Sequence, residues 1–324
     1  MRKWYVSGLI SLLGVVMVAP TLAWASTPTP PVGSPGQGLE ISPPVIELEA
    51  DPGQTVTAAI RVRNVTRGEL IAKGKADDFG AGADEEGKPR LLLDETGATR
   101  FSLKYWVSGV PDLRLAPQEL KSTTVSIAVP ANAEPGGHFG VVRFTAVPPE
   151  LEGTGVALSA SVGTLILLKV SGQIKDQLSL TEFGVTRQGK PGPWFEYGPL
   201  DFLVRVKNDG SVHEKPQGSV KITNMFGRQV ANLKVNDKGG NVLPDSIRRF
   251  ELAWSEKRLF GRYTAKLSLT YAGNKKLDST LTFWVIPWRL IGLVLVGLLV
   301  LFFLLRLGLR RYNQHIIEQA NNRR

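Results

Sequence analysis

Residues 56–64 read Val-Thr-Ala-Ala-Ile-Arg-Val-Arg-Asn, and residues 204–208 read Val-Arg-Val-Lys-Asn. In both stretches apolar side chains alternate with polar or small ones, and both end in an asparagine. A period of two residues is that of a β-strand with one buried face and one solvated face. Because the two stretches lie far apart in the chain, they predict two similar β-domains in series.

The same alternation recurs along the region between these stretches and beyond them. It is found at residues 123–129, 202–206, 250–254 and 263–271. Glycine and proline turns separate these segments, and no long amphipathic helical pattern lies between them. We therefore predict an all-β fold class: two tandem immunoglobulin-like antiparallel β-sandwiches, at 39–172 and 173–284, plus one C-terminal transmembrane helix.

The composition leaves little material for catalysis. The 324 residues include no cysteine and three histidines, so disulfides, cysteine nucleophiles and thiolate metal sites are excluded. His138 and His213 fall in predicted turns without an acid or serine at a recurring spacing. We predict that the protein is not an enzyme and has no cofactor or metal site.

Two acidic groups, Asp77-Asp78 and Asp84-Glu85-Glu86, flank the glycine-rich loop 80–87. A calcium loop and a hydrolase acid pair are two readings of such groups. Calcium requires six to eight oxygen ligands on a tight spacing, and that pattern is absent from this sequence. We interpret the segment as the solvated tip of a hairpin.

The net charge of +10 is unevenly distributed. Arg2 and Lys3 precede one apolar segment, and Arg306, Arg310 and Arg311 follow another. Charge in these places reports membrane topology, whereas a nucleic-acid surface would carry it on the folded domains. The sequence therefore predicts no nucleic-acid partner.

The N-terminus has the three parts of a secretory signal. Met-Arg-Lys is followed by an apolar run over 4–22 and then by Ala23-Trp-Ala25. We predict a signal peptide at 1–25, cleaved after Ala25, with an uncleaved signal anchor as the alternative. The proline-rich leader 26–38 that follows is expected to be extended.

The second apolar segment, 285–305, has 21 residues, enough to cross about 30 Å of hydrocarbon as a helix. Trp284 and Trp288 lie where interfacial aromatics are expected. The basic tail 306–324 is predicted to be cytoplasmic by the positive-inside rule, which places 26–284 outside the cell membrane. A buried core helix is the alternative reading.

Clustered aromatic residues are the candidate binding sites. They are Tyr105, Trp106, Trp194, Phe195 and Tyr197. Exposed aromatics stack on sugar rings or anchor protein interfaces. The alternative is that they cap the end of a sandwich or fill the joint between the two domains.

Turn and strand-end motifs in the first domain resemble those of a known family. The matching features are Ile41-Ser-Pro-Pro44, the Pro52-Gly53 turn, the strand ending at Asn64, Leu115-Ala-Pro117, Ile127-x-Val-Pro130, Gly136-Gly-x-Phe-Gly140 and Val142-x-Phe144. With these features, residues 39–172 resemble the WxL-interacting proteins of Gram-positive surfaces. The order of signal peptide, two β-domains, membrane helix and basic tail also agrees. The resemblance implies peptidoglycan binding by the first domain and host binding by the second.

These observations predict a non-enzymatic, membrane-anchored cell-surface protein. Its expected partners are cell-wall polymer (peptidoglycan) or other surface proteins, in adhesion or surface assembly. A chaperone-like scaffold that accepts a partner strand is the first alternative. A glycan hydrolase or lectin with a cleft between its domains is the second.

Overall fold

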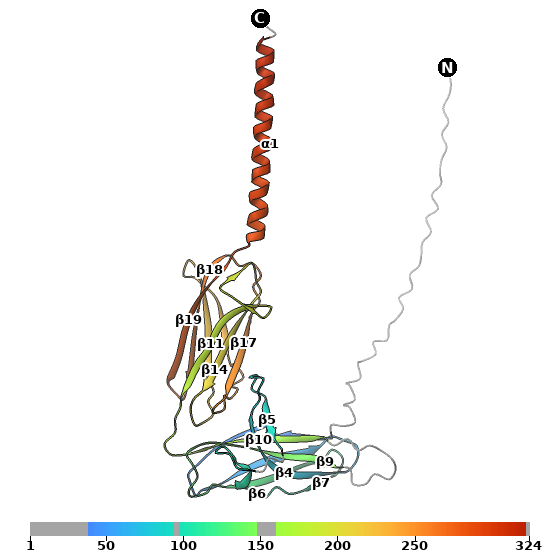
Figure 1. Ribbon diagram of the computed structural model, residues 1–324. Coiled ribbons are helices and arrows are strands. Elements are labelled where there is room, and N and C mark those ends of the chain that lie inside the picture. The colour runs from blue at the N-terminus through green and yellow to red at the C-terminus, as the bar shows by residue number, and fades with distance from the viewer. Residues whose placement is uncertain (1–37, 94–96, 148–159, 322–324) are drawn as a thin grey trace, which may run out of the picture. The chain divides into compact units, whose positions relative to one another are not determined.

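The computed structural model describes residues 38–93, 97–147 and 160–321, with side chains as far as Arg311. The signal peptide predicted at 1–25 and the leader up to residue 37 lie outside the described residues. The two sandwiches and the C-terminal helix belong to one compact unit. Figure 1 shows the strands of the first sandwich in blue to green and those of the second in yellow to orange.

The first sandwich contains ten strands and one short 3-10 helix within the described residues. They are β1 (Leu39–Ser42), β2 (Val45–Ala50), β3 (Thr55–Asn64), β4 (Leu70–Ala81), β5 (Pro89–Leu92), η1 (Lys104–Trp106), β6 (Val107–Ser108), β7 (Leu113–Leu115), β8 (Leu120–Ala128), β9 (Gly136–Val147) and β10 (Ser161–Val170). One sheet has the order β1-β3-β8-β6, and the other has the order β2-β10-β9-β4-β5, with β7 also on β4.

The second sandwich repeats this plan with nine strands. They are β11 (Leu178–Arg187), β12 (Lys190–Pro191), β13 (Trp194–Phe195), β14 (Leu200–Asn208), β15 (Gln217–Asn224), β16 (Gln229–Val235), β17 (Ile247–Trp254), β18 (Gly261–Tyr271) and β19 (Lys275–Val285). Its sheets have the orders β12-β11-β14-β17 and β13-β19-β18-β15-β16. The all-β prediction is confirmed.

Near the start of each sandwich the chain passes from one sheet to the other at a proline. After Pro44 the chain runs parallel to β10, and Leu165 N donates to Pro44 O at 2.9 Å. After Pro193 it runs parallel to β19, and Trp284 N donates to Pro193 O at 2.8 Å. Proline has no N–H for a sheet ladder, so it marks the point where the chain leaves one sheet. The other named strand pairs are antiparallel, so the predicted antiparallel sandwiches differ from the structure at these closing pairs.

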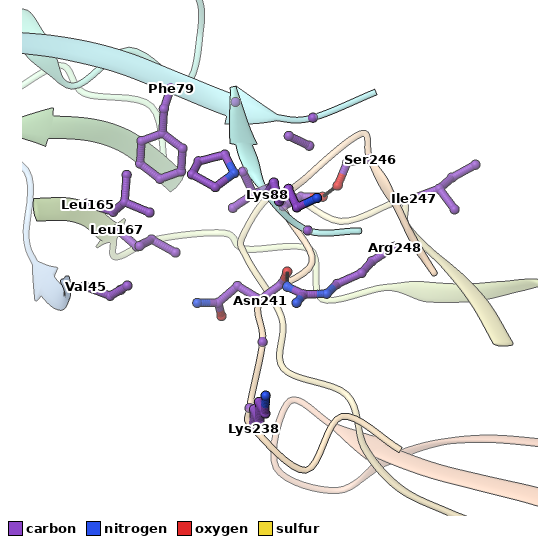
Figure 2. A pocket seen from close by; sticks show the side chains of 18 of the residues that line it. Val45, Phe79, Lys88, Leu165, Leu167, Lys238, Asn241, Ser246, Ile247 and Arg248 are labelled. Atoms are coloured by element: carbon purple, nitrogen blue, oxygen red, sulfur yellow. Dashed lines mark hydrogen bonds between the residues drawn. The ribbon is translucent and has the colours of Figure 1, made fainter. Parts of the chain in front are cut away.

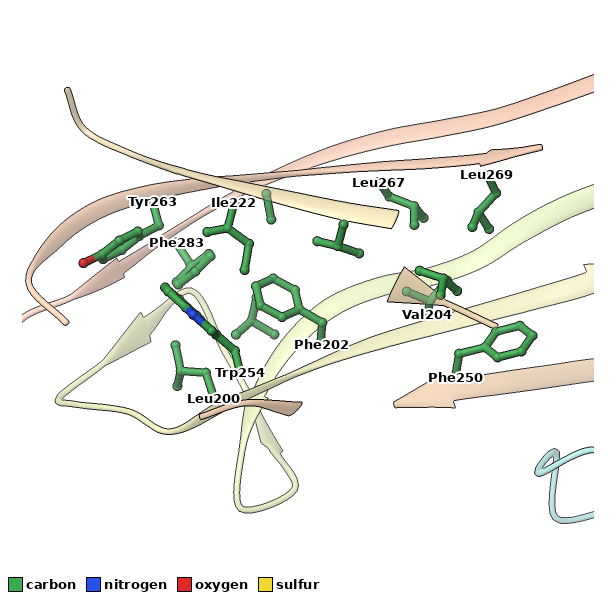
Figure 3. Close-up of a cluster of buried hydrophobic side chains, with 14 of the residues drawn as sticks. Leu200, Phe202, Val204, Ile222, Phe250, Trp254, Tyr263, Leu267, Leu269 and Phe283 are labelled. Carbon is green, nitrogen blue, oxygen red and sulfur yellow. The ribbon is translucent and has the colours of Figure 1, made fainter. Parts of the chain in front are cut away.

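Each sandwich has its own hydrophobic core between its two sheets. In the second, Phe202, Trp254 and Phe283 meet in tilted and edge-to-face contacts with ring centroids 5.8–6.3 Å apart. Figure 3 shows these rings converging with Tyr263 from both sheets. Burial of one such side chain contributes roughly 1.5–3 kcal/mol, so the inward alternation seen in the sequence holds the sheets together.

The two asparagines that end the repeated sequence stretches are equivalent in the fold. Asn64 Nδ2 donates to three carbonyls, those of Gly68, Leu115 and Ala116, at 2.7–3.1 Å. Asn208 Nδ2 donates to Val212 O at 2.7 Å and to Val242 O at 2.8 Å. Both side chains are fully buried. Each asparagine therefore ties the end of the sandwich's second long strand to a turn remote in sequence.

The C-terminal helix α1 runs from Trp288 to Asn321. Its segment Trp288–Arg311 is long and apolar enough to cross a membrane, with a mean hydropathy of 2.9. The predicted start at Val285 is wrong, because Val285 ends β19, pairs with Gly261 and is fully buried in the second core. The helix also continues past residue 305, where the predicted tail begins.

Replacing Asn64 or Asn208 with alanine is expected to destabilise the fold. Each change removes two or three side-chain hydrogen bonds to backbone carbonyls, and each of these bonds contributes about 0.5–1.5 kcal/mol. Thermal unfolding should therefore begin several degrees lower in both variants. The exposed strand residue Asn232 makes no side-chain hydrogen bond, so Asn232→Ala is the matched control and should unfold like the parent. Unchanged melting of Asn64→Ala and Asn208→Ala would contradict the structural role assigned to these residues.

Candidate functional site

The tip of the β4–β5 hairpin contacts the second sandwich. Glu85 accepts a hydrogen bond from Arg205 Nε at 2.7 Å, and its carbonyl accepts one from Arg249 N at 2.7 Å. The hydrogen bond from Arg205 holds the pKa of Glu85 below its usual range. The sequence reading of this loop as a solvated tip is therefore wrong for Glu85, which docks on β14 and β17.

Three further contacts join the sandwiches. Glu47 on β2 accepts hydrogen bonds from Lys215 Nζ at 2.5 Å and from Asn241 Nδ2 at 3.0 Å. Arg100 pairs with Asp245. Gly137 N donates to Ser211 O at 2.8 Å. The acids at this junction are thus already neutralised by bases from the partner sandwich.

An apolar surface underlies the junction. Phe79, Phe139, Val141 and Leu167 are buried on the face of the β2-β10-β9-β4-β5 sheet that points away from the first core, and they form a separate cluster. Leu243, in the loop between β16 and β17 of the second sandwich, packs against this cluster. This sheet is therefore covered on both faces, by its own sandwich and by the loops that contact it.

A cavity of about 390 Å³ remains between this surface and the second sandwich. We call it the junction pocket. Figure 2 shows Phe79, Leu165 and Leu167 on one side, facing Asn241 and Arg248. The rim includes Lys88 from the hairpin and Lys238 from the second sandwich.

Arg248 is the principal charged group of the junction pocket. Its Nη1 donates to Asn241 O at 2.6 Å, whereas its Nε is buried without a hydrogen-bond partner. Burial lowers the pKa of its guanidinium. A side chain in place of Gly87 or Gly240 would clash with this guanidinium, so the two glycines create the slot that holds it.

A second unpartnered atom lies in the same pocket. Asn241 Oδ1 is buried and accepts no hydrogen bond, although the Nδ2 of the same amide donates to Glu47. The junction pocket therefore offers one N–H donor on a cation and one amide acceptor above an apolar floor. Buried polar groups without partners are uncommon in folded proteins, so this pair makes the junction pocket the candidate binding site.

The five aromatics predicted as binding candidates do not meet in one site. Tyr105 is exposed on η1, whereas Trp106 is partly buried and packs on His138 with ring centroids 4.2 Å apart. Trp194 is exposed and stacks on Trp284. Phe195 lies in the second core, which removes its side chain from any partner.

Tyr197, the fifth candidate, is exposed beneath the guanidinium of Arg187, which lies 3.9 Å from its ring centroid. The candidates therefore divide between η1, the second core, and the end of the second sandwich from which the chain continues into α1.

The remaining acids and histidines have structural contacts. Asp77 on β4 is buried and pairs with Arg143 at 3.0 Å, while Asp78 accepts from Leu103 N and Lys104 N at 2.8 Å. His138 lies within β9 and not in the predicted turn. Across the described ranges, no three or more His, Asp and Glu side chains are grouped so that they could hold a metal ion.

Sequence reasoning missed Arg248 and Asn241. Each belongs to no motif, and Arg248 sits in the strand sequence Ile-Arg-Arg-Phe beside another arginine. Only the docking of the hairpin and the positions of the glycines distinguish Arg248, whose Nε lacks a hydrogen-bond partner, from Arg249, which pairs with Glu86 and Glu251.

Comparisons with known proteins return similarities of fold only. No protein-family model and no curated protein sequence matches the chain. A class 5 fimbriae chaperone, CfaA, aligns over 77% of this chain and 99% of its own, with 14% identity and a TM-score of 0.37. The Escherichia coli chaperone DraB covers 74% and 95%, with 13% identity and a TM-score of 0.34.

A Salmonella enterica complex of SafA pilin with the SafB chaperone matches over 75% of this chain and 96% of that chain, with 13% identity and a TM-score of 0.36. At these similarities we transfer no partner or ligand to this chain. The fold itself is established here by its strand order and its two cores.

Glu214, near the junction, is expected to make stability depend on pH. Burial raises its pKa to about 7 from 4.5, and the negative charge of Asp176 contributes. Below pH 4.5 the carboxyl is protonated in both states, so the fold has its full stability with respect to this group. As pH rises towards about 7, the unfolded chain ionises first and stability falls.

Glu214→Gln removes this dependence. At pH 8 the variant should melt at a higher temperature than the parent, and its free energy of unfolding should be larger by at most ~3 kcal/mol. Below pH 4.5 the difference between the two should disappear. Glu40→Gln, on an exposed strand position, is the control and should leave the pH profile unchanged. Parallel profiles for Glu214→Gln and the parent would contradict the assignment.

Proposed function

We propose that the chain is a membrane-anchored, non-enzymatic surface protein whose junction pocket binds a peptide segment of another surface protein. The observation that carries this proposal is the guanidinium of Arg248, held in an apolar cavity with its Nε unpartnered. The helix α1, long and apolar enough to span a membrane, supports the anchoring.

The chemistry of the junction pocket favours an apolar side chain next to a carboxylate. Phe79, Leu165 and Leu167 supply the apolar floor. A carboxylate on Arg248 would complete the hydrogen bonding of Nε, and hydrogen bonds between charged groups are the strong ones in proteins. Asn241 Oδ1 would accept a backbone N–H of the same segment. The carboxylate could come from an acidic side chain or from a free C-terminus.

A partner strand on an open sheet edge is the second candidate. β13 pairs with β19 only at Trp284 and Val285, so within the described part of the chain the outer edge of β19 from Lys275 to Phe283 has no neighbouring strand. The N–H of Trp284 points outward to β13, and the N–H groups of Thr282 and Thr280 follow the same alternation. An edge of this length is a template for strand addition.

The wall contact implied by the resemblance to WxL-interacting proteins is a separate proposal for residues 39–172. The exposed Tyr105 on η1 is the aromatic best placed for it. Sedimentation of the full chain with washed cell-wall sacculi tests it, with Tyr105→Ser as the variant. Equal sedimentation of the parent and of Tyr105→Ser would remove Tyr105 from that role.

Binding of labelled peptides to the full chain in detergent tests the junction pocket. Three extended peptides, each with an apolar residue, serve as probes. In the first an internal glutamate follows the apolar residue, in the second a free C-terminal carboxylate follows it, and in the third a C-terminal amide follows it and there is no carboxylate. Peptides with either carboxylate should bind at least about tenfold more tightly than the amide, which reflects the loss of one hydrogen bond to a charged group. The preferred carboxylate identifies the kind of segment recognised.

Variants separate the two candidate surfaces. Arg248→Gln should abolish the preference for carboxylate, while the control Arg67→Gln, at an exposed arginine of the first sandwich, should retain it. Thr280→Pro removes an outward N–H without breaking the β18–β19 ladder, so binding lost in this variant but kept in Arg248→Gln would assign the edge instead. Equal binding of all three peptide classes, or cleavage of a peptide or glycan, would overturn the proposal.

A further inference from the structure

The end of the second sandwich from which α1 leaves has an unusual surface. Between residues 178 and 287, the exposed large hydrophobic side chains are Trp194, Tyr197, Met225, Phe226, Val230, Phe260 and Trp284. Phe226 is 82% exposed and Phe260 is 61% exposed. Exposed apolar residues scattered singly are ordinary, but their collection at one end of a domain marks an interaction site.

The strand registers place these residues at a common end. Val285 on β19 pairs with Gly261 on β18, and Tyr263 on β18 pairs with Asn224, which precedes the turn containing Phe226. Phe260 directly precedes β18. Trp194 pairs with Trp284, and the two indole rings stack at 5.5 Å with planes 9° apart.

Basic residues surround the aromatic ones. The segments 187–198, 224–229, 255–263 and 284–289 together carry seven lysines and arginines but only two acids. The basic residues are Arg187, Lys190, Arg228, Lys257, Arg258, Arg262 and Arg289. Among them, only Arg289 forms a salt bridge in the described part of the chain, with Glu196. This end therefore presents free positive charge beside exposed aromatic rings.

The connection to α1 keeps this end close to any membrane that the helix crosses. Only Ile286 and Pro287 separate β19 from α1. Ile286 N donates to Phe195 O on β13, and Ile291 N donates to Pro287 O, so the connection is tied to β13 and to the first turn of α1. Three residue steps reach about 11 Å at most, so Val285 lies inside the headgroup layer, which is roughly 5–8 Å thick, or within a few ångströms of its outer surface.

We infer that this end of the second sandwich is a lipid-binding surface that rests on the outer leaflet of the membrane spanned by α1. Phe226, Phe260 and the Trp194–Trp284 pair enter the interfacial layer, where amphipathic and aromatic rings are favoured. The lysines and arginines bind anionic headgroups, each contributing about 1 kcal/mol near a charged surface. The occupant is a bilayer, because the helix delivers one to this surface and the charges match acidic lipid.

The inference rests on the proposed membrane anchoring and has a distinct physical consequence. A sandwich that rests on the bilayer as well as being attached through α1 cannot rotate freely about its two-residue connection. The junction pocket is therefore held within a restricted range of heights above the membrane. A partner segment must then be presented within that range.

Site-directed spin labelling of the full chain tests this inference. The chain has no cysteine, so single labels can be placed by Phe226→Cys, Phe260→Cys, Asn274→Cys and Leu298→Cys. Asn274 is exposed in the β18–β19 turn at the opposite end of the sandwich, and Leu298 lies in the apolar part of α1. The chain is reconstituted in nanodiscs of phosphatidylcholine alone or mixed with phosphatidylglycerol.

Labels at 226 and 260 should be relaxed by lipid-soluble oxygen more than by a water-soluble nickel chelate, and the label at 274 should show the reverse. Phosphatidylglycerol should increase the protection at 226, and Arg262→Gln should reduce that increase, whereas Lys276→Gln at the far end of β19 should not. A label at 298 in lipid with labels at 226 and 260 in water would overturn the inference and leave the anchoring intact. A label at 298 in water would overturn both.

Discussion

The point at which the opening strand of each sandwich crosses between sheets determines which edges of the protein stay open. In the first sandwich the crossing comes after four residues of β1, and β2 then covers β10 over six residue pairs. In the second sandwich β11 remains in its first sheet for ten residues, and β13 reaches β19 at only two pairs. The outer edge of β10, the last strand of the first sandwich, is therefore covered by β2, whereas most of the outer edge of β19, the last strand of the second, is left open.

The same crossing positions the junction. Because β2 extends the sheet of β10, β9 and β4, its Glu47 reaches Lys215 and Asn241 of the second sandwich. The hairpin of β4 and β5, at the opposite edge of that sheet, places Glu85 within hydrogen-bond distance of Arg205. Two ionic contacts on either side of an apolar surface explain why a cavity remains between them: the charged groups fix the spacing, and the apolar side chains of one sheet cannot fill it.

The distribution of polar groups along the second sandwich supports a division of labour. At the junction, bases and acids from the two sandwiches neutralise one another, and Arg248 keeps one N–H, at its Nε, without a hydrogen-bond partner. At the other end, every basic residue named above except Arg289 lacks a salt bridge within the described residues, and aromatic side chains are exposed. The first arrangement suits selective binding of one segment, because buried polar groups discriminate strongly. The second suits a broad, fluid surface such as lipid, because it offers area and charge without fixed geometry.

Much of the fold could be predicted from local sequence. The period-two alternation indicates strands, the asparagines at 64 and 208 mark equivalent turns, and the long apolar segment indicates the helix, because each signal depends on neighbours in the chain. The parallel closing pairs could not be read in this way. Pro44 and Pro193 are visible as breaks, but a break does not say to which strand the chain moves next.

The candidate site was the least accessible to sequence reasoning. Of the five aromatics named from the sequence, Phe195 proved to be core, and the more exposed Phe226 and Phe260 were not among them, because exposure depends on how the strands and turns pack in the folded chain. What the sequence by itself determined was the periodic burial of side chains and the apolar length of α1. Only the tertiary structure decided that the Nε of Arg248 is buried without a hydrogen-bond partner, since its environment comes from Gly87, Asn241 and the floor of a different sandwich.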